Sequence, residues 1–365
     1  MKFSNEYRSP ELIEKYLTKI KKITQKKWNI MEVCGGQTHA IFRYGIDQLI
    51  PPKINLLHGP GCPVCVTPSD MIDKAIMISF KPQTVLCTFG DMIRVPGSHD
   101  DLLSAKAKGA NIRVVYSPLE AVELAKINHN QAFVFMAIGF ETTAPLIASV
   151  VLTADKLNLN NFYILNGMVR IPPAIEMLLS NPAGKIDALL APGHVCTISG
   201  YCEYEFISSK YNIPIIITGF EPADLVQGIF MAIDQLENGK AQVVNQYARA
   251  VIREGNNNAQ LNINRVFDLA DRHWRGLGVI KDSGYVLNNK FMQFDAQSHF
   301  NISVASSAND SRCIASDILQ GFAKPDQCPE FNRNCRPDNP IGPMMVSSEG
   351  ACSAYYKYRS NYAKR

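Results

Sequence analysis

The sequence lacks any long uncharged apolar run of the kind that spans a membrane. Its best candidate, Gln131–Ala154, carries Glu141 and Pro145 in its middle, and these residues predict a buried strand followed by a helix instead. The first residues are charged and lead into an expected helix over Pro10–Lys22, so no secretory or transit segment is expected. We therefore expect a cytoplasmic protein with no membrane association.

The sequence also lacks a strong excess of charge of either sign. Its 37 Lys and Arg residues against 33 Asp and Glu residues leave a formal net charge of only +4, and the basic residues are scattered. This distribution argues against the basic patch that nucleic-acid binding requires. With 46% hydrophobic and 19% charged residues over a length of 365, the composition is that of a globular protein with two or three domains.

What the sequence does contain is a set of ten cysteines. A reducing cytoplasm does not favour structural disulfides, so these thiols are expected to serve chemistry or packing. They form two groups separated by a long gap, which predicts two separate chemical roles. The first group is Cys34, Cys62, Cys65, Cys87, Cys196 and Cys202, and the second is Cys313, Cys328, Cys335 and Cys352. No role is assigned to Cys87, Cys196 or Cys202.

Residues 28–235 repeat one pattern, in which a short apolar run ends in a glycine-containing turn and a helical stretch follows. Continuous apolar runs are typical of strands buried on both faces of a parallel sheet, and parallel strands need helical crossovers. We therefore predict an α/β fold with two similar parallel-sheet α/β domains that face a cleft, divided near residues 117–131. Ligands commonly bind at the carboxyl ends of such strands, where the Gly, Cys and His motifs fall.

The expected domain boundaries are residues 1–120, 121–235 and 236–365. In the third region, Val243–Glu254 and Asn264–Trp274 are expected to be helical. From Cys313 onward, cysteines and prolines interrupt any long periodicity, and polypeptide of this kind usually needs a metal in order to fold.

The four C-terminal cysteines are spaced C-x14-C-x6-C-x16-C, and no histidine lies among them. Four thiolates suit either zinc or an iron–sulfur cluster. Structural zinc sites commonly use CxxC pairs, which this region lacks, so the wide spacing favours a cluster. Zinc and unrelated buried thiols remain as alternatives.

The sequence GPGCPVC at residues 59–65 contains a CxxC pair, Cys62 and Cys65, which could close a disulfide or bind a metal. The TPSD sequence that follows from Thr67 has the form of a helix cap with proline at the first helical position. Cys65 would then lie just ahead of a helix N-terminus, where the helix dipole stabilises a thiolate. A redox role is favoured over half of a zinc site, because no second CxxC pair exists to complete one.

Three further motifs at strand ends hold weaker candidates. CGGQTH at residues 34–39 offers the thiol of Cys34 and the imidazole of His39, with glycines that allow iron or a partner group to approach the backbone. Glu141 in GFETTAP and His194 in PGHV supply a carboxylate and a second imidazole. Each has a structural alternative: an inert buried cysteine beside a hydrogen-bonded histidine, a helix cap, or an interface hydrogen bond.

Taken together, these residues resemble those of the hydrogenase maturation factor HypD family. The resemblance runs from residue 28 to residue 358 and rests on several long and rare motifs, together with the C-terminal cysteine spacing. One departure is Cys196, which follows PGHV where the family usually carries a small residue such as serine. The motifs are CGGQTH (34–39), GPGCPVC (59–65), GFETTAP (139–145), PGHV (192–195), GFEP (219–222), WRGLG (274–278) and SSEGACSAYYKY (347–358).

The resemblance implies two similar α/β domains plus a C-terminal iron–sulfur domain, in which the four C-terminal cysteines bind a [4Fe–4S] cluster. It implies that Cys62 and Cys65 form a dithiol/disulfide pair. It also implies that Cys34, with His39 nearby, holds iron together with a small HypC-like partner.

The implied function is [NiFe]-hydrogenase maturation, as a scaffold and redox protein for assembly of the Fe(CN)2CO group, with a HypE-like partner that delivers cyanide. His39, Glu141 and His194 are then candidates to hydrogen-bond the diatomic ligands or to shuttle protons. Two other functions are kept as alternatives: an iron–sulfur-dependent dithiol/disulfide reductase that acts on a protein substrate, and a non-enzymatic zinc scaffold. The sequence is compatible both with catalytic turnover and with a platform that does not turn over.

Overall fold

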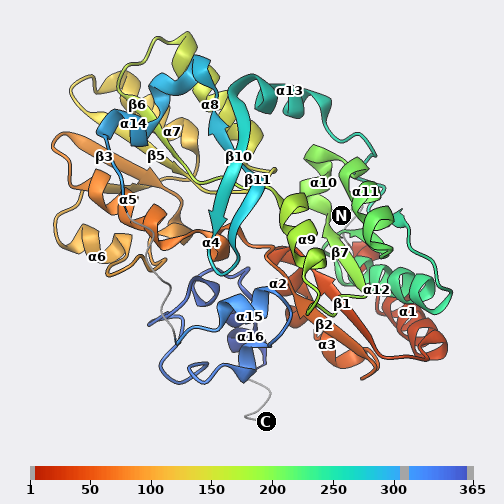
Figure 1. Cartoon of the computed structure of the whole chain (residues 1–365). Coiled ribbons are helices and arrows are strands. Elements are labelled where there is room, and N and C mark those ends of the chain that lie inside the picture. The colour runs from red at the N-terminus through yellow and green to blue at the C-terminus, as the bar shows by residue number, and fades with distance from the viewer. Residues whose placement is uncertain (1–4, 305–311, 360–365) are drawn as a thin grey trace.

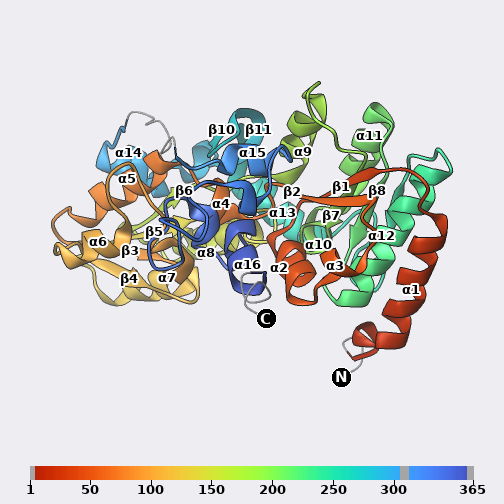
Figure 2. The same ribbon diagram turned by 90° about the horizontal axis from the view of Figure 1, so that it is seen from below.

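The computed structural model describes residues 5–304 and 312–359. Two parallel sheets, each covered by helices, lie side by side, and the C-terminal segment with helix α16 (Ala351–Tyr358) lies between them (Figures 1 and 2). The predicted α/β fold with two parallel sheets is confirmed. Among the described residues, no helix combines the length and apolar character needed to cross a bilayer.

Sheet A has five parallel strands in the order β2-β1-β7-β8-β9. Its register places Glu32 of β1 opposite His58 of β2 on one side and Leu190 of β7 on the other. The strands therefore end together at one edge of the sheet. They are β1 (Trp28–Glu32), β2 (Ile54–His58), β7 (Ala188–Pro192), β8 (Ile215–Thr218) and β9 (Val243–Asn245).

Sheet B has four parallel strands in the order β4-β3-β5-β6. Every residue of β3 and β6 is buried, as expected for strands covered on both faces. The strands are β3 (Thr84–Thr88), β4 (Ile112–Val114), β5 (Ala132–Ala137) and β6 (Phe162–Asn166).

The sheets do not follow the expected division of the chain near residue 120. β1 and β2 share sheet A with β7, β8 and β9, while β3 to β6 form sheet B, so the chain leaves sheet A and returns to it. The expected break at residues 117–131 instead contains α7 (Pro118–Ile127), which packs on β5 within the second unit. An apolar run indicates that a strand is buried but does not indicate which strand lies next to it. The predicted domain boundary near residue 120 is wrong for this reason.

Beyond sheet A, the chain forms an antiparallel hairpin of β10 (Phe267–Trp274) and β11 (Gly278–Leu287). The expected helices over 243–254 and 264–274 are therefore wrong: residues 243–245 form β9, and helix α13 (Asn257–Val266) ends where β10 begins. Pairing with β11 decides the conformation of β10, and local periodicity carries no information about such a partner. Gly276 and Gly278 make the turn with φ of +82° each, a conformation that favours glycine.

The helices cover both faces of the sheets. Two expectations are confirmed here: a helix begins at Pro10, and the apolar segment 131–154 forms a strand and a helix. The remaining helices are α1 (Pro10–Ile23), α2 (Gly35–Arg43), α3 (Ile46–Leu49), α4 (Pro63–Val66), α5 (Ser69–Ser79), α6 (Leu102–Ala107), α8 (Ala144–Lys156), α9 (Ile171–Ser180), α10 (Gly193–Ser199), α11 (Cys202–Tyr211), α12 (Pro222–Glu237), α14 (Ala296–Phe300) and α15 (Ala315–Leu319), with short 3-10 helices η1 (Asn5–Arg8), η2 (Gly90–Met92), η3 (Asn289–Phe294), η4 (Pro325–Gln327) and η5 (Pro343–Met345).

Candidate functional site

The carboxyl edge of sheet A carries three of the predicted motifs. Strand β1 is followed by Cys34, which is the N-cap of α2. The neighbouring β2 leads into Gly59 and the CxxC segment, and β7 on the other side leads into His194 on α10. Because these strands are adjacent in the order β2-β1-β7, the motifs lie together, as the strand-end pattern predicts.

The loops after β1 and β2 are in backbone contact. Gly35 N donates to Gly61 O at 2.8 Å, and Gly59 N donates to Glu32 O at 2.8 Å. A Cβ at Gly61 would lie 2.1 Å from Cys34 N, so only glycine fits against this backbone. The loop that carries Cys34 and the loop that leads to the CxxC pair therefore form one unit.

The CxxC pair is buried at the start of α4. Cys62 is the N-cap of this short helix, and its Sγ accepts from Cys65 N at 3.3 Å. Burial and the neighbouring Cys62 raise the pKa of Cys65 well above its ordinary value. As expected, Cys65 lies ahead of the helix that begins in the TPSD segment, α5, although it is also inside the short helix α4 and Pro68, not Thr67, is the N-cap of α5. The expectation of a stabilised thiolate is wrong, because burial raises the pKa of Cys65.

Cys34 is half-buried, and all ten cysteines are free thiols in this structure. Burial and the charge of Glu349 raise the pKa of the Cys34 thiol to about 12. Glu349 lies directly over Gly35, since a Cβ on that glycine would be 2.5 Å from the Cβ of Glu349. The same carboxylate contributes to the raised pKa of Cys65, so Glu349 lies near both thiol centres.

A fully buried carboxylate supports Cys34 from behind. Glu32 accepts from Cys34 N at 3.3 Å, from Thr38 Oγ1 at 2.6 Å and from His58 Nδ1 at 2.7 Å. The other ring nitrogen of His58 lies 3.3 Å from the hydroxyl of Tyr355 on α16. These contacts join β1, β2, α2 and α16.

His39 binds the C-terminal segment. Its Nδ1 lies 3.0 Å from Ser348 O and its Nε2 lies 3.1 Å from the Tyr358 hydroxyl. Both ring nitrogens thus have partners on the segment that contains the SSEGACSAYYKY motif.

His194 is exposed at the same edge. Its ring stacks on Phe220 with centroids 3.7 Å apart, and partial burial lowers its pKa. A Cβ on Gly36 would lie 3.1 Å from the Phe220 ring and 3.8 Å from Cys34 Sγ. Phe220 therefore connects His194 to the neighbourhood of Cys34.

Glu141 follows β5 of sheet B and is only 2% exposed. Its Oε1 accepts from Ile171 N at 3.0 Å, at the start of α9, whereas Oε2 is buried with no hydrogen-bond partner. Burial raises the pKa of Glu141 to about 7. Glu141 also lines a cavity with Arg170 and Tyr285.

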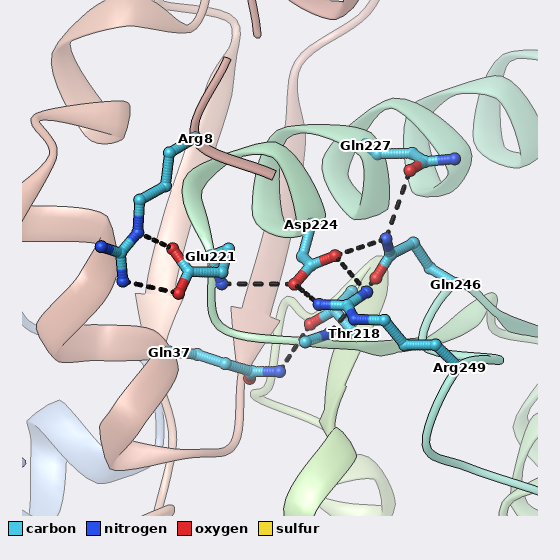
Figure 3. A network of polar contacts seen from close by, with 9 residues as sticks. Arg8, Gln37, Thr218, Glu221, Asp224, Gln227, Gln246 and Arg249 are labelled. Atoms are coloured by element: carbon cyan, nitrogen blue, oxygen red, sulfur yellow. Dashed lines mark hydrogen bonds and ion pairs between the residues drawn. The ribbon is translucent and has the colours of Figure 1, made fainter. Parts of the chain in front are cut away.

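Helix α2 is fixed to the sheet by Gln37 (Figure 3). The side-chain amide of Gln37 donates to Thr218 Oγ1 at 2.6 Å and to Ala191 O at 3.0 Å, at the ends of β8 and β7. This buried amide sets the position of the helix that begins at Cys34.

The GFEP motif begins α12 and joins a larger polar network (Figure 3). Glu221 accepts two hydrogen bonds from Arg8, at 2.5 and 2.7 Å. Asp224 is fully buried and accepts from Arg249 at 2.8 and 2.5 Å and from Gln246 at 2.8 Å. Glu221 of the motif and Asp224, two residues after it, therefore cap and anchor α12 next to the site.

The four C-terminal cysteines line one cavity between α15, the loop at 328–342 and α16. Ile341 N donates to Cys335 Sγ at 3.4 Å, and a Cβ on Gly342 would lie 2.4 Å from Cys313 Sγ. Burial and the other three cysteines raise the pKa of Cys352, which lies at the start of α16. Among the described residues, no three His, Cys, Asp or Glu side chains are gathered tightly enough around one point to hold a single metal ion.

Three residues of this site are not among the candidates predicted from the sequence: Glu32, His58 and Glu349. Glu32 is the one carboxylate in the expected strand 28–33, and a charge inside a buried strand is a usable signal. His58 directly precedes the GPGCPVC motif. Glu349 lies far along the chain, so only the fold brings it to Cys34.

Known proteins match the chain over nearly its whole length. The family described as "HypD: Hydrogenase formation hypA family" matches residues 11–359. The hydrogenase maturation factor HypD of Escherichia coli K12 is 43% identical over 367 residues, with 98% of each chain covered. HypD of Rhodobacter capsulatus is 41% identical over 98% of each chain, and a putative hydrogenase expression/formation protein of Methanocaldococcus jannaschii is 44% identical over 95% of this chain and 97% of its own. The chain therefore belongs to the HypD family of hydrogenase maturation factors.

Proposed function

We propose that this protein is a scaffold and redox protein for assembly of the Fe(CN)2CO group of [NiFe]-hydrogenases, acting with a HypC-like chaperone and a HypE-like cyanide donor. One observation carries the proposal: the Cys34 loop and the loop leading to Cys62 are in direct backbone contact at Gly61. A soft metal ligand and a dithiol are thus held side by side.

The iron with its diatomic ligands is the cargo of this site. Cys34 supplies one thiolate, and a cysteine of the small partner supplies another. Because burial and Glu349 raise the pKa of Cys34 to about 12, iron must displace its proton, and Glu349 is positioned to receive it.

The Cys62–Cys65 pair supplies redox chemistry. Joining the two sulfur atoms as a disulfide releases two protons and two electrons, and opening the disulfide takes them up. Helix α4, which carries Cys65, contacts η5 of the C-terminal segment, and the charge of Cys352 contributes to the raised pKa of Cys65. The Cys62–Cys65 pair therefore lies next to the C-terminal segment, which forms the four-cysteine cavity.

The four cysteines of that cavity would hold a [4Fe–4S] cluster, since four thiols around one cavity and no imidazole match its usual ligand set. The bound cluster would supply one-electron transfer. Gly342 leaves space beside Cys313, and the Ile341 amide bonds the sulfur of Cys335, a type of contact that tunes such clusters.

His194 and Glu141 are proposed to act on protons or on the diatomic ligands. His194 is a neutral imidazole at neutral pH because its pKa is lowered, so it can either donate or accept. Glu141 has a pKa of about 7 and an unpartnered oxygen, which suits proton exchange. His39 has both nitrogens bonded to the C-terminal segment, and we assign it to holding that segment near Cys34.

The test is anaerobic purification with the small partner, followed by an iron count and infrared spectroscopy. The proposal expects more iron than a cluster alone contains, together with absorption in the cyanide and carbonyl stretching region. Iron at the level of one cluster with no such bands, together with reduction of a protein disulfide, would favour the reductase instead. A colourless protein containing zinc would favour the zinc scaffold.

A further inference from the structure

One buried chain of hydrogen bonds runs from the backbone of Cys34 to the C-terminal helix. It passes from Cys34 N to Glu32, from Glu32 to His58 Nδ1, and from His58 Nε2 to the Tyr355 hydroxyl. The distances are 3.3, 2.7 and 3.3 Å, and Glu32, His58 and Tyr355 are at most 3% exposed. Tyr355 lies on α16, which begins just before Cys352.

The donors in this chain have a defined direction. Glu32 receives the Cys34 amide, the Thr38 hydroxyl and the His58 ring, which are three donors around one carboxylate. His58 therefore carries its proton on Nδ1, which leaves Nε2 to accept from the Tyr355 O–H. A role in capping α2 or in pairing β1 would not require Glu32 to accept three hydrogen bonds.

Further contacts fix helix α16 to α2 and α3. The Tyr355 ring packs on Phe42 of α2 with centroids 4.3 Å apart, and Arg359, at the C-terminal end of α16, donates to Asp47 of α3. The segment that holds Cys352 is thus packed against the helix that begins at Cys34. A displacement of α16 reaches Cys34 through Tyr355, His58 and Glu32.

We propose that Glu32 and His58 are positioning residues for Cys34, and that the Tyr355 hydroxyl couples their geometry to helix α16 and hence to Cys352. The inference rests on the proposed function only in assigning Cys34 a chemical role. This series of hydrogen bonds orients the Cys34 thiol and makes its orientation depend on the position of α16.

The test is the rate at which iodoacetamide alkylates Cys34 in the full-length native protein, followed by mass spectrometry of the Cys34 peptide. Tyr355→Phe removes one hydroxyl and no packing. We expect the Cys34 rate to change at least threefold in this variant. The matched control is Tyr163→Phe, which removes the hydroxyl that donates to Asn160 O at 2.8 Å in sheet B. It should shift the melting temperature by a similar amount and leave the Cys34 rate unchanged.

His58→Gln is the second variant, because it breaks the chain one step nearer to Cys34. Its effect on the Cys34 rate should be at least as large, and adding Tyr355→Phe to it should change nothing further, since the link is already cut. Equal rates in wild type and Tyr355→Phe, or fully additive effects in the double variant, would overturn the coupling. Alkylation needs neither cargo iron nor partner, so failure of this inference is distinguishable from failure of the proposed function.

Discussion

Gly61 lies against Cys34 so closely that a Cβ on the glycine would be 2.1 Å from Cys34 N and 2.3 Å from its Cα. Strands β1 and β2 are neighbours whose last residues, Glu32 and His58, lie opposite each other, and the loops that follow them are in backbone contact at this point. The thiol proposed to hold iron and the dithiol proposed for redox chemistry are therefore fixed relative to each other by backbone, not by flexible side chains.

Gly61→Ala should disturb this contact strongly. The added methyl group meets backbone that cannot rotate away, so we expect a loss of about 1–3 kcal/mol or more in stability, together with failure to retain cargo iron. Gly90→Ala is the control, because the nearest atom to a Cβ there is 3.6 Å away. Thermal melting and an iron count in both variants give the answer, and a wild-type iron content in Gly61→Ala would contradict the prediction.

Cys34→Ala should fold normally and keep the visible absorption of the proposed iron–sulfur cluster, because Cys34 is half-buried at the N-cap of α2 and is not one of the proposed cluster ligands. It should lose the additional iron that the proposed function expects the protein to retain together with the small partner. Infrared spectroscopy of the anaerobic complex checks this expectation. Ligand bands of wild-type intensity would show that another residue holds the iron.

Cys328→Ala should abolish the brown colour expected of the proposed cluster and destabilise the C-terminal segment, because one of its four proposed ligands is lost. Cys202→Ala is a suitable control, since Cys202 is exposed and its Sγ donates to Arg253 O, away from the four-cysteine cavity. Visible absorption and proteolysis of the C-terminal segment distinguish the two variants. A normal visible spectrum for Cys328→Ala would remove this residue from the ligand set.

Glu141 gives a pH-dependent contribution to stability. Burial raises its pKa from 4.5 to about 7, so the folded protein binds this proton more tightly than the unfolded chain does. The contribution is present in full below pH 4.5 and is lost as the pH rises through about 7, with a total on the order of 3 kcal/mol. Melting temperatures of wild type minus those of Glu141→Gln should therefore fall across this interval. A pH-independent difference would mean that Glu141 titrates normally.

Arg249→Ala should be strongly destabilising because Asp224 is fully buried and would lose two of its hydrogen bonds. We expect a cost on the order of 3 kcal/mol. Arg8→Ala is the comparison: Arg8 pairs with Glu221 in the same network but is exposed, and its removal should barely change the melting temperature. Equal losses in both variants would show that burial of Asp224 does not set the cost.

The α/β class and the strand ends could be predicted because they follow from local patterns. Apolar runs that end in glycine, as before Cys34 and Gly59, predict both burial and the place where loops gather. Local patterns could not predict that β1 and β2 form one sheet with the distant strands β7, β8 and β9. β1 pairs with β7, and nothing in Trp28–Glu32 specifies a partner at Ala188–Pro192.

At the site, the identity of the candidate residues could be predicted more easily than their pKa values. Cys34, Cys62 and Cys65 were found from motif chemistry, yet the raised pKa of Cys65 depends on burial inside α4. Glu349 approaches Cys34 only because α16 packs on α2, which is a contact between opposite ends of the chain. Long-range packing of this kind has no local sequence signal.

The interleaved sheets also set an order of events during synthesis. Strand β1 needs β7 beside it, so the loop at Cys34 lacks one wall until residue 192 has left the ribosome, and it lacks Glu349 and Tyr355 until the chain is almost complete. A nascent chain therefore carries Cys34 before the residues that surround it in the folded protein are in place. Under the proposed function, the ability to hold iron at Cys34 would therefore be acquired only when synthesis of the chain is almost complete.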